Sequence, residues 1–289
     1  MPTRGLKKFK PAELEPESLE TATAEILHCR AGQKPKRQLD HLAKEEPLEI
    51  RVRGRSVAVS MRTPGHDAEL AAGFLVSEGM IHKSMDVLGI APCQQGEAAD
   101  YENVLNVFLA PSVEVDFERL TRHVFASSSC GLCGKASIES VHQHFAPVES
   151  GMKMTAKKIL GLPARLRAAQ EAFEKTGGLH AAAVFDAQGR VLVVREDVGR
   201  HNAVDKVIGH GFLKGGLPFD QHVLLVSGRA SFEIMQKALA ARIPIICAVS
   251  APSSLAVEFA RESGQTLVGF LRGETMNIYS HPERITSRA

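Results

Sequence analysis

The sequence has few aromatic residues, and this shortage argues against one class of ligand. Tryptophan is absent, tyrosine occurs twice, and the three aromatic types together make up 5% of the 289 residues. A protein that binds single-stranded nucleic acid by stacking its bases needs more aromatic side chains. The formal net charge is only +2, whereas nucleic-acid-binding proteins carry a strong basic field. We therefore expect no nucleic-acid partner.

Long apolar runs are also missing. The most apolar stretches, HVLLVS (222–227) and IPIICAVS (243–250), are far shorter than the roughly 20 residues that a membrane-spanning helix needs. The first residues, MPTRGLKKFKPAELEPE, are charged and lack the apolar segment of a secretory signal. These features predict a cytoplasmic protein without a membrane partner.

Cysteine is scarce, and its spacing does not suit a disulfide framework. Of five cysteines, Cys130 and Cys133 form a C-x-x-C pair, whereas Cys29, Cys93 and Cys247 are widely separated. Small secreted proteins held together by disulfides have an even, closely spaced set. We expect reduced thiols, so the close pair needs a chemical explanation.

The chain is long enough for two domains, and its composition changes along its length. Residues 1–44 mix Lys, Glu and Pro, with only a weak helical pattern near Thr21–Leu27. They are interpreted as an N-terminal extension, either a loosely ordered tail or an arm that contacts a partner. Residues 45–145 are interpreted as a small α+β domain that ends in a mobile cysteine loop at about 122–137, and residues 146–289 as an α/β domain.

Local patterns predict the elements of the small domain. Alternating apolar residues on both sides of Arg53-Gly54 predict a hairpin. The segment TPGHDAELAAGFLVSEGM (63–80) predicts a helix that Asp67 caps and that ends at Gly79. VLNVFLA (104–110) predicts a strand, and VEVDF (113–117) predicts one more.

Strands and helices alternate in the second domain. Residues 156–178 predict two short helices, or one interrupted at Pro163; 179–185 and 190–197 predict a hairpin; 199–211 predict an amphipathic helix stopped by glycine. Three apolar strands (222–228, 243–250, 265–273) then alternate with two helices. This order implies parallel strands, right-handed crossovers and burial on both faces. The predicted fold class is α/β, with a three-layer C-terminal domain and a smaller α+β N-terminal domain.

Ligands of open α/β sheets gather at the carboxyl ends of the strands. Here these ends carry SGRAS (227–231), SAPSS (250–254) and RGET (272–275). Loops that lead into helix N-termini, with the guanidinium groups of Arg229 and Arg272, suit a phosphate. The candidate residues of the first loop are Ser227, Gly228 and Arg229. The alternative is that Ser231 and Ser253 merely cap helices and the arginines are solvated.

A polar stretch, REDVGRHNAVDK (195–206), joins a strand to a helix. One interpretation is a ligand-binding or acid–base cluster, and the other is a capped helix with a salt-bridged face. Its candidate residues are Glu196, Asp197, Arg200, His201, Asn202 and Asp205. His180, a lone histidine at the start of a strand, is interpreted as a core residue with a backbone partner.

The C-x-x-C pair suits three chemistries. A structural zinc site needs four ligands, and the chain has one pair; the deaminase signature H-x-E with P-C-x-x-C is also missing. A thioredoxin-type pair starts a helix, whereas glycine and serine surround Cys130 and Cys133. A sulfur carrier needs an exposed, partly deprotonated thiol, which His123 and Lys135 would favour. The spacing alone leaves these alternatives open.

Seven blocks, in order, resemble the formate dehydrogenase accessory sulfurtransferase family (FdhD/NarQ). One of them is SSCGLCGK (128–135), which contains the pair. The others are TPGHDAELAAGFLVSEGM, GGLHAAAVF, REDVGRHNAVDKVIG, LLVSGRASFEIMQKA, PIICAVSAPSSLAVEFA and TLVGFLRGETMNIYSHPER. The likeness runs from about residue 47 to about residue 285 and leaves out residues 1–44.

The resemblance implies a sulfurtransferase that carries sulfur from a cysteine desulfurase to the molybdenum cofactor, for formate dehydrogenase. It implies a cytoplasmic homodimer, whose larger domain binds the cofactor and is similar to cytidine deaminases but has no zinc or other metal of its own. Cys130 matches the persulfide-bearing cysteine, and Cys133 matches a second cysteine whose need varies among members.

The resemblance also implies a cargo, Mo-bis(molybdopterin guanine dinucleotide), bound near the C-terminus. The matching positions are Phe270, Leu271, Arg272, Gly273, Glu274 and Thr275. Two alternatives remain: a chaperone that holds the cofactor without sulfur transfer, or a zinc or dithiol module.

Overall fold

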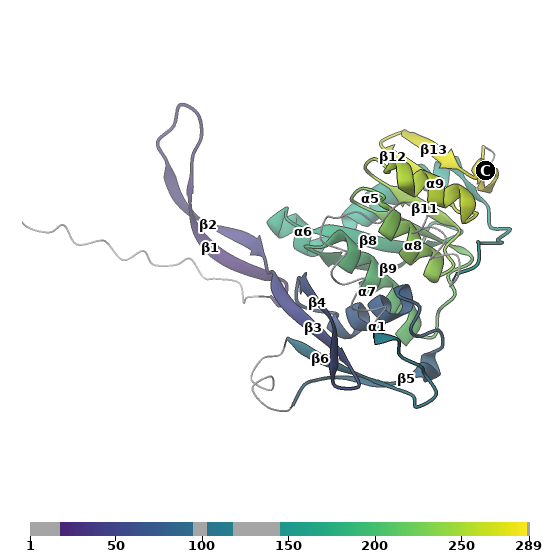
Figure 1. Cartoon of the computed structure of the whole chain (residues 1–289). Helices are drawn as coiled ribbons and strands as arrows, with labels where there is room; N and C mark the ends of the chain where they lie inside the picture. Colours follow the sequence, from purple (N-terminus) through teal and green to yellow (C-terminus); the bar gives the residue numbers. More distant parts are fainter. Residues whose placement is uncertain (1–17, 95–102, 118–144, 288–289) are drawn as a thin grey trace, which may run out of the picture.

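The computed structural model describes residues 18–94, 103–117 and 145–287. Figure 1 shows a body of helices and sheets from which a thin β-hairpin projects. The body holds a six-stranded sheet, a four-stranded sheet and a short two-stranded sheet. No helix in these ranges is long and apolar enough to cross a membrane.

The six-stranded sheet has the order β13-β12-β11-β10-β8-β9. Its strands are β8 (His180–Asp186), β9 (Val191–Asp197), β10 (His222–Val226), β11 (Ile245–Ala248), β12 (Thr266–Arg272) and β13 (Thr275–Ser280). Strands β10, β11 and β12 are parallel, as predicted, and β8 and β9 form the predicted antiparallel hairpin. The sheet is mixed because β8 and β13 join the parallel strands antiparallel to their neighbours.

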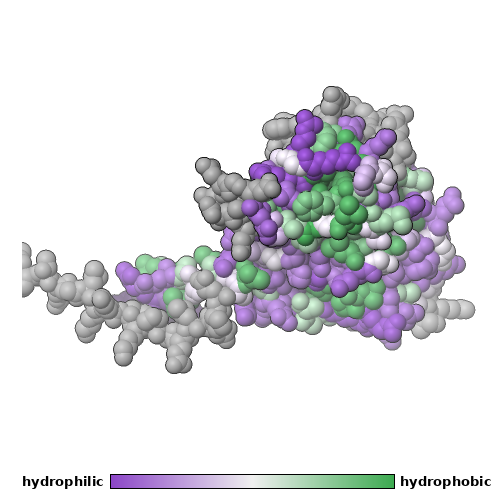
Figure 2. All heavy atoms as spheres, turned by 90° about the horizontal axis from the view of Figure 1, so that it is seen from below, coloured by the Kyte–Doolittle hydropathy of each residue, from purple (hydrophilic) through white to green (hydrophobic). Residues whose placement is uncertain are grey.

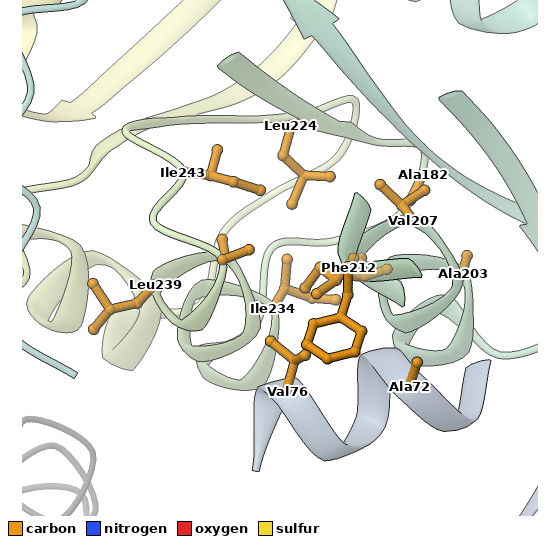
Figure 3. Packing of buried hydrophobic residues seen from close by; sticks show 14 of the residues in the cluster. Ala72, Val76, Ala182, Ala203, Val207, Phe212, Leu224, Ile234, Leu239 and Ile243 are labelled. Carbon is orange, nitrogen blue, oxygen red and sulfur yellow. The ribbon is translucent and has the colours of Figure 1, made fainter. Parts of the chain in front are cut away.

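Alternate residues of this sheet enter different apolar clusters. The buried apolar residues form two clusters. Leu224 of β10 belongs to the larger one, which we call the first apolar cluster, and Leu225 belongs to the smaller one, the second apolar cluster. Helices α7 (Arg200–Leu213), α8 (Phe232–Ala240) and α9 (Ser254–Glu262) pack into the first cluster, shown in Figure 3. Helices α4 (Ala156–Leu160) and α5 (Leu162–Ala168) pack into the second. The resemblance to cytidine deaminases stays a prediction.

The four-stranded sheet has the order β4-β3-β6-β5. Its strands are β3 (Glu46–Val52), β4 (Arg55–Arg62), β5 (Val87–Pro92) and β6 (Val104–Leu109). The hairpin at Arg53-Gly54 is confirmed, and both residues have positive φ, 50° and 75°. The strand predicted at 113–117 is wrong, since these residues pair with no strand, and β5 was not predicted.

Helix α1 (Asp67–Ser77) joins the two sheets because it packs closely on α7. At the crossing, a Cβ atom on Gly73 would overlap the carbonyl of Asp205, and one on Gly209 would overlap the carbonyl of Glu69. Residues of the four-stranded sheet, such as Leu48, therefore share the first apolar cluster with α7. The predicted domain boundaries, 45–145 and 146–289, stay a prediction.

The predicted cap of α1 and the predicted end of α7 are wrong, whereas the predicted end of α1 is confirmed. His66 holds the N-cap position of α1, and Asp67 instead accepts two hydrogen bonds from Arg62, at 2.8 and 2.9 Å. Gly79 follows the end of α1 with φ of 70°, as predicted. Helix α7 continues past its glycines to Leu213 and is buried along most of its length rather than on one face.

Residues 156–176 form three short helices where two or one were predicted. The third is α6 (Glu171–Thr176). The remaining elements are β7 (Met154–Thr155), β14 (Ile285–Thr286) and two short 3-10 turns (Ser84–Asp86, Pro282–Arg284).

The segment near Thr21–Leu27, whose weak pattern predicted a helix, forms a strand. Residues Thr21–His28 form β1, which pairs antiparallel with β2 (Lys36–Ala43). We call residues 18–44 the N-terminal arm; Figures 1 and 2 show it extending away from the body. The helical interpretation failed because a two-stranded ribbon with little burial has no apolar period to reveal it.

Apolar side chains gather in the middle of the face shown in Figure 2, bordered by hydrophilic ones. The strands of the four-stranded sheet contribute exposed Val59, Met61, Leu88 and Phe108. The inward side chains of the same sheet, such as Ile50, belong to the core.

Candidate anion-binding site

Three loops meet at the carboxyl ends of β10, β11 and β12, as predicted from the sequence. Ala230 N donates to Ala251 O at 3.2 Å, which joins the first loop to the second. Phe270 N donates to Ser250 O at 3.0 Å, and Arg272 Nε donates to Val249 O at 2.7 Å. These bonds bring residues 227–231, 249–253 and 269–275 into one surface.

The first loop is fixed to the neighbouring strand β8. Ser227 N donates to Ala181 O, and Ala181 N donates to Ser227 Oγ, both at 2.9 Å. A Cβ atom on Gly228 would lie 3.3 Å from His180 Nδ1 and 3.7 Å from Arg200 Cδ. Gly228 thus keeps the backbone close to both side chains, and glycine there leaves room for a ligand.

Four cationic or titratable groups gather beside this loop: His180, Arg200, His201 and Arg229, which we call the cationic cluster. Burial lowers the pKa of His180 below its usual value, and the charges of Arg200, His201 and Arg229 lower it further. Arg200 Nε is buried and has no hydrogen-bond partner among the described residues. A buried donor without a partner is costly, so an anion that accepts its hydrogen bond would be favoured here.

His201 links the cluster to the start of α8. Its Nε2 lies 2.9 Å from Glu233 Oε2 and 3.2 Å from Ser231 Oγ. The hydrogen bond from His201 holds the pKa of Glu233 below its usual value. Ser231 holds the N-cap position of α8, but its hydroxyl donates to Glu233 at 3.3 Å and caps nothing. The backbone N–H groups at this helix start therefore lack their usual side-chain cap.

Ser253, in contrast, fits the alternative interpretation, in which these serines cap helices. Its hydroxyl accepts a hydrogen bond from Ala256 N at 3.2 Å and so caps α9. The alternative that the serines of these loops are helix caps thus holds for Ser253 but not for Ser231.

The segment from Phe270 to Thr275 comprises the end of β12, the turn at Gly273 and Glu274, and the first residue of β13. Phe270 has φ of 50° and is 39% exposed, and the guanidinium of Arg272 lies 5.7 Å from its ring centre. Glu274 and Gly273 are exposed, and Thr275 Oγ1 donates to Arg272 O at 3.2 Å.

Leu271 differs from its neighbours because its side chain is fully buried in the second apolar cluster. A ligand at this turn would not reach Leu271, which is 0% exposed, whereas Phe270, Arg272 and Glu274 remain open to it.

The polar stretch 195–206 divides into two roles. Arg200 and His201 face the cationic cluster, whereas Asp197, at 0% exposure, forms an ion pair with Lys206 at 2.7 Å. Asp205 forms a second buried ion pair, with Lys237, also at 2.7 Å.

Two further members of the stretch are structural. Glu196 accepts hydrogen bonds from Ala172 N and Phe173 N at the start of α6. Asn202 donates to Asp197 Oδ1 at 2.9 Å. Most of this stretch therefore follows the salt-bridged interpretation, whereas a ligand at Arg200 and His201 stays a prediction.

Sequence reasoning missed His180, which was interpreted as a core histidine. It is half-buried, and its ring lies against Gly228, which is distant in sequence. The sequence signal that could have identified His180 was its position at the start of a strand, next to the loop that contains Ser227, Gly228 and Arg229. Together, the cluster, the start of α8 without a side-chain cap and the glycine form a site suited to phosphate oxygens.

Cys130 and Cys133 lie outside the described residues, but the chain on either side of them is attached to the body. The guanidinium of Arg55 lies 4.7 Å from the ring centre of Phe117. On the other side, Phe145 is 8% exposed, and Arg242 donates to the carbonyl groups that follow it. Phe117 and Phe145, the described residues that flank the pair, are thus fixed to the body.

Three further cysteines lie among the described residues. Cys29 is exposed, and Cys93 and Cys247 are buried. Within the described ranges no group of three His, Cys, Asp or Glu residues is arranged to hold a metal ion.

Known proteins resemble this chain over most of its length. The sulfur carrier protein FdhD of Mycobacterium tuberculosis is 52% identical over 273 residues, which cover 92% of this chain and 99% of the relative. That of Streptomyces coelicolor is 49% identical and covers 93% of this chain and 97% of the relative. That of Thermoplasma volcanium is 44% identical and covers 85% and 89%.

A solved structure agrees with the fold. A crystal structure from Desulfotalea psychrophila, of a protein assigned as a formate dehydrogenase accessory protein, matches with a TM-score of 0.73 and 27% identity. The match covers 92% of this chain and 100% of that one.

A sequence model of the FdhD/NarQ family matches residues 43–286. Residues 43–289 are 247 of the 289 residues, or about 85% of the chain, so the alignments that cover 92–93% also include part of residues 1–42. These alignments thus include at least part of the N-terminal arm, most of which the family model leaves out. On the match of the family model and the identity to these relatives, the chain belongs to the FdhD/NarQ family.

Proposed function

We propose that this protein is a sulfurtransferase that carries sulfur as a persulfide on Cys130. The sulfur comes from a cysteine desulfurase and passes to the molybdenum cofactor that formate dehydrogenase requires. The observation that carries the proposal is the C-x-x-C pair in a chain about 50% identical to proteins named sulfur carriers.

The transfer to Cys130 needs no oxidant. The Cys130 thiolate attacks the outer sulfur of the donor's cysteine persulfide, the sulfur–sulfur bond breaks, and the donor cysteine leaves as a thiolate. Delivery can follow in two ways. Either an electron pair of the acceptor attacks the outer sulfur, the sulfur–sulfur bond breaks and Cys130 leaves as a thiolate, or Cys133 attacks the inner sulfur, releases hydrosulfide and leaves a Cys130–Cys133 disulfide, which a dithiol must then reduce.

The cargo in this proposal is Mo-bis(molybdopterin guanine dinucleotide), bound at the carboxyl ends of β10, β11 and β12. Its phosphates suit the cationic cluster, and its guanosine groups would lie toward the segment Phe270–Thr275. The support is the unpartnered Nε of Arg200, the uncapped start of α8 and the backbone left open by Gly228. The protein's residues bind and orient the cargo and supply no metal.

The proposed setting is the cytoplasm, with the protein acting as a homodimer. Formate dehydrogenase is the proposed recipient, in keeping with the relative from Desulfotalea psychrophila.

The deciding experiment replaces Cys130. In cells that lack the endogenous protein, we expect Cys130→Ala to abolish formate dehydrogenase activity and Cys29→Ser, a matched thiol replacement, to preserve it. Mass spectrometry of the wild-type protein incubated with a desulfurase and cysteine should show one added sulfur on Cys130. Full activity of Cys130→Ala would instead support a chaperone that only holds the cofactor.

Elemental analysis addresses the other alternative. One zinc ion per chain, lost in Cys130→Ala, would identify the pair as part of a zinc module and overturn sulfur transfer. The same samples should contain no added sulfur in that case.

A further inference from the structure

The N-terminal arm is fixed at its base and free at its tip. Lys44 N donates to Glu20 O at 2.9 Å, and Thr63 Oγ1 donates to Lys44 O at 2.9 Å, which ties the base to the body. Beyond the base, eight residues of β1 pair with eight of β2. At about 3.3 Å per residue, the tip lies roughly 26 Å from the start of the ribbon.

Such a ribbon has little to stabilise it in isolation. A two-stranded hairpin alone is marginally stable in water because it buries too little apolar surface. The arm nevertheless exposes leucines on both of its faces: Leu27 at 60% and Leu39 at 40% on one, and Leu42 at 46% on the other. These side chains and the open strand edges would be covered if another protein packed against the arm.

The tip also carries a single sign of charge. Residues 28–37, HCRAGQKPKR, contain four Lys or Arg residues and no Asp or Glu. Arg37 forms an ion pair with Glu25 at 2.9 Å, whereas Arg30, Lys34 and Lys36 are exposed and form no ion pair within the described part of the chain. Exposed leucines beside unpaired cations suit a protein surface with acidic and apolar groups. The arm has no aromatic residue, so it lacks a platform for nucleic-acid bases.

The protein has two proposed partners, the cysteine desulfurase and formate dehydrogenase. The position of the arm indicates which of them it meets. Strand β2 leads directly into β3, and β3 pairs with β4, whose Arg55 contacts Phe117 at the start of the cysteine-bearing segment. The arm forms a two-stranded sheet of its own, and the chain links its base through β3 and β4 to this attachment point. The anion-binding site belongs to the other sheet, at the ends of β10, β11 and β12.

We propose that the N-terminal arm docks an acidic surface of the enzyme that donates sulfur to Cys130. This inference rests on the proposed function. The cations raise the rate of encounter with an acidic donor, and the leucines add contact area once the donor is bound. Relatives that lack residues 1–42 would bind their donors without this contact.

The test measures the rate of persulfide formation on Cys130 with a purified cysteine desulfurase from the same organism and cysteine. The variant is Arg30→Glu/Lys34→Glu/Lys36→Glu in the full chain. The control, Lys153→Glu/Lys157→Glu/Lys214→Glu, makes the same charge change on exposed residues of the body. We expect the tip variant to need at least tenfold more donor for half-maximal rate at low salt, with an unchanged maximal rate. The control should match the wild type.

A second donor separates docking from damage to the protein. Inorganic polysulfide needs no protein contact, so it should load Cys130 equally in the wild type and in both variants. Raising the salt concentration should slow donor-dependent loading of the wild type more than that of the tip variant, since screening removes the attraction.

The outcomes are distinct. Equal donor dependence of the wild type and the tip variant would overturn the arm's role and leave the sulfur-carrier proposal intact. Failure of the desulfurase to load even the wild type would overturn the carrier proposal itself, and the arm's role with it. Binding of the wild type, but not of the tip variant, to phosphatidylserine vesicles, with no effect on loading, would assign the tip to a membrane surface and also overturn the inference.

Discussion

Lys206 Nζ lies 2.7 Å from Asp197 Oδ2, and the two side chains are 1% and 0% exposed. The same ammonium group donates to Thr63 O at 2.8 Å, and Thr63 N donates to Asp197 at 3.2 Å. Asp197 is also the partner of His180 in the register of β8 and β9. This buried pair therefore connects the strand position beside His180, a member of the cationic cluster, to Thr63, which precedes α1.

Loss of either member of this pair should destabilise the fold, because the other charge would remain buried without its partner. For Lys206→Met we expect the free energy of unfolding to fall by about 3–5 kcal/mol, measured by urea denaturation. The matched replacement Arg167→Met removes an exposed ion pair with Glu174 and should cost less than about 1 kcal/mol. Similar losses in the two variants would contradict this view of the buried pair.

The crossing of α1 and α7 requires glycine. Gly73→Ala and Gly209→Ala each push a methyl group into a backbone carbonyl of the other helix, so the helices must separate. We expect each variant to lose at least about 3 kcal/mol of stability or to fail to accumulate. Gly151→Ala is the control, since nothing lies within 4 Å of its Cβ position. Normal thermal stability of Gly73→Ala would refute the close crossing.

Arginine side chains of the cationic cluster should determine the affinity for guanosine diphosphate. Hydrogen bonds to charged groups contribute about 1.5–3 kcal/mol, so Arg200→Met and Arg229→Met should each weaken binding about tenfold or more in calorimetry. Arg190→Met, which removes an exposed arginine paired with Asp186, should bind like the wild type. Unchanged affinity in both cluster variants would exclude this surface as the phosphate site.

The affinity for guanosine diphosphate should rise as the pH falls. Without ligand, burial and neighbouring cations hold the pKa of His180 below its usual 6.5, so the ring is neutral at pH 8. A bound phosphate favours the charged ring, and binding strengthens as the pH falls from 8 through 6.5. His180→Gln should remove this part of the pH dependence, leaving only that of the nucleotide. An identical pH profile in wild type and variant would contradict the contact.

The same pKa has a consequence for the protein without ligand. Because the unfolded chain binds the proton of His180 more tightly than the folded one, this residue lowers the free energy of unfolding as the pH drops below about 6.5. The loss between pH 7.5 and pH 5.5, measured by urea denaturation, should be smaller in His180→Gln. It should not vanish, because burial also lowers the pKa values of His66 and His222.

Cys247 should resist both alkylation and sulfur loading. It is completely buried, and burial raises the pKa of its thiol far above the usual value, so it forms no accessible thiolate. In the folded protein at pH 8 we expect iodoacetamide to modify the exposed Cys29 at least tenfold faster than Cys247, as measured by peptide mass spectrometry. Rapid modification of Cys247 would indicate that the sheet opens readily.

Sequence patterns predicted the six-stranded sheet well where burial is complete. The runs at 222–226 and 245–248 are apolar at nearly every position, because side chains on both faces of β10 and β11 enter a core. The hairpin at Arg53-Gly54 was also predictable, since its turn needs two residues with positive φ and glycine favours that conformation. The N-terminal arm was not, because its ribbon packs on the body only near its base and nearly all of β2 is exposed.

The candidate site was predictable only in outline. The strand-end loops and Arg229 follow from the alternation of strands and helices, whereas His180 and Arg200 join them through contacts across the sheet. The position of Asp67 could not be predicted either. Aspartate is a good helix cap, but the carboxylate of Asp67 accepts hydrogen bonds from Arg62 instead. Such choices depend on neighbours that are distant in sequence.

The apolar cluster that α1 and α7 share between the two sheets affects how the whole molecule unfolds. Leu48 of one sheet and Leu224 of the other belong to the same set of contacts, so neither sheet can lose its packing alone. Heating should therefore give a single calorimetric transition whose van't Hoff and calorimetric enthalpies agree. A chain cut between residues 145 and 146 would yield two fragments that each expose half of one core, and we expect neither to fold without the other.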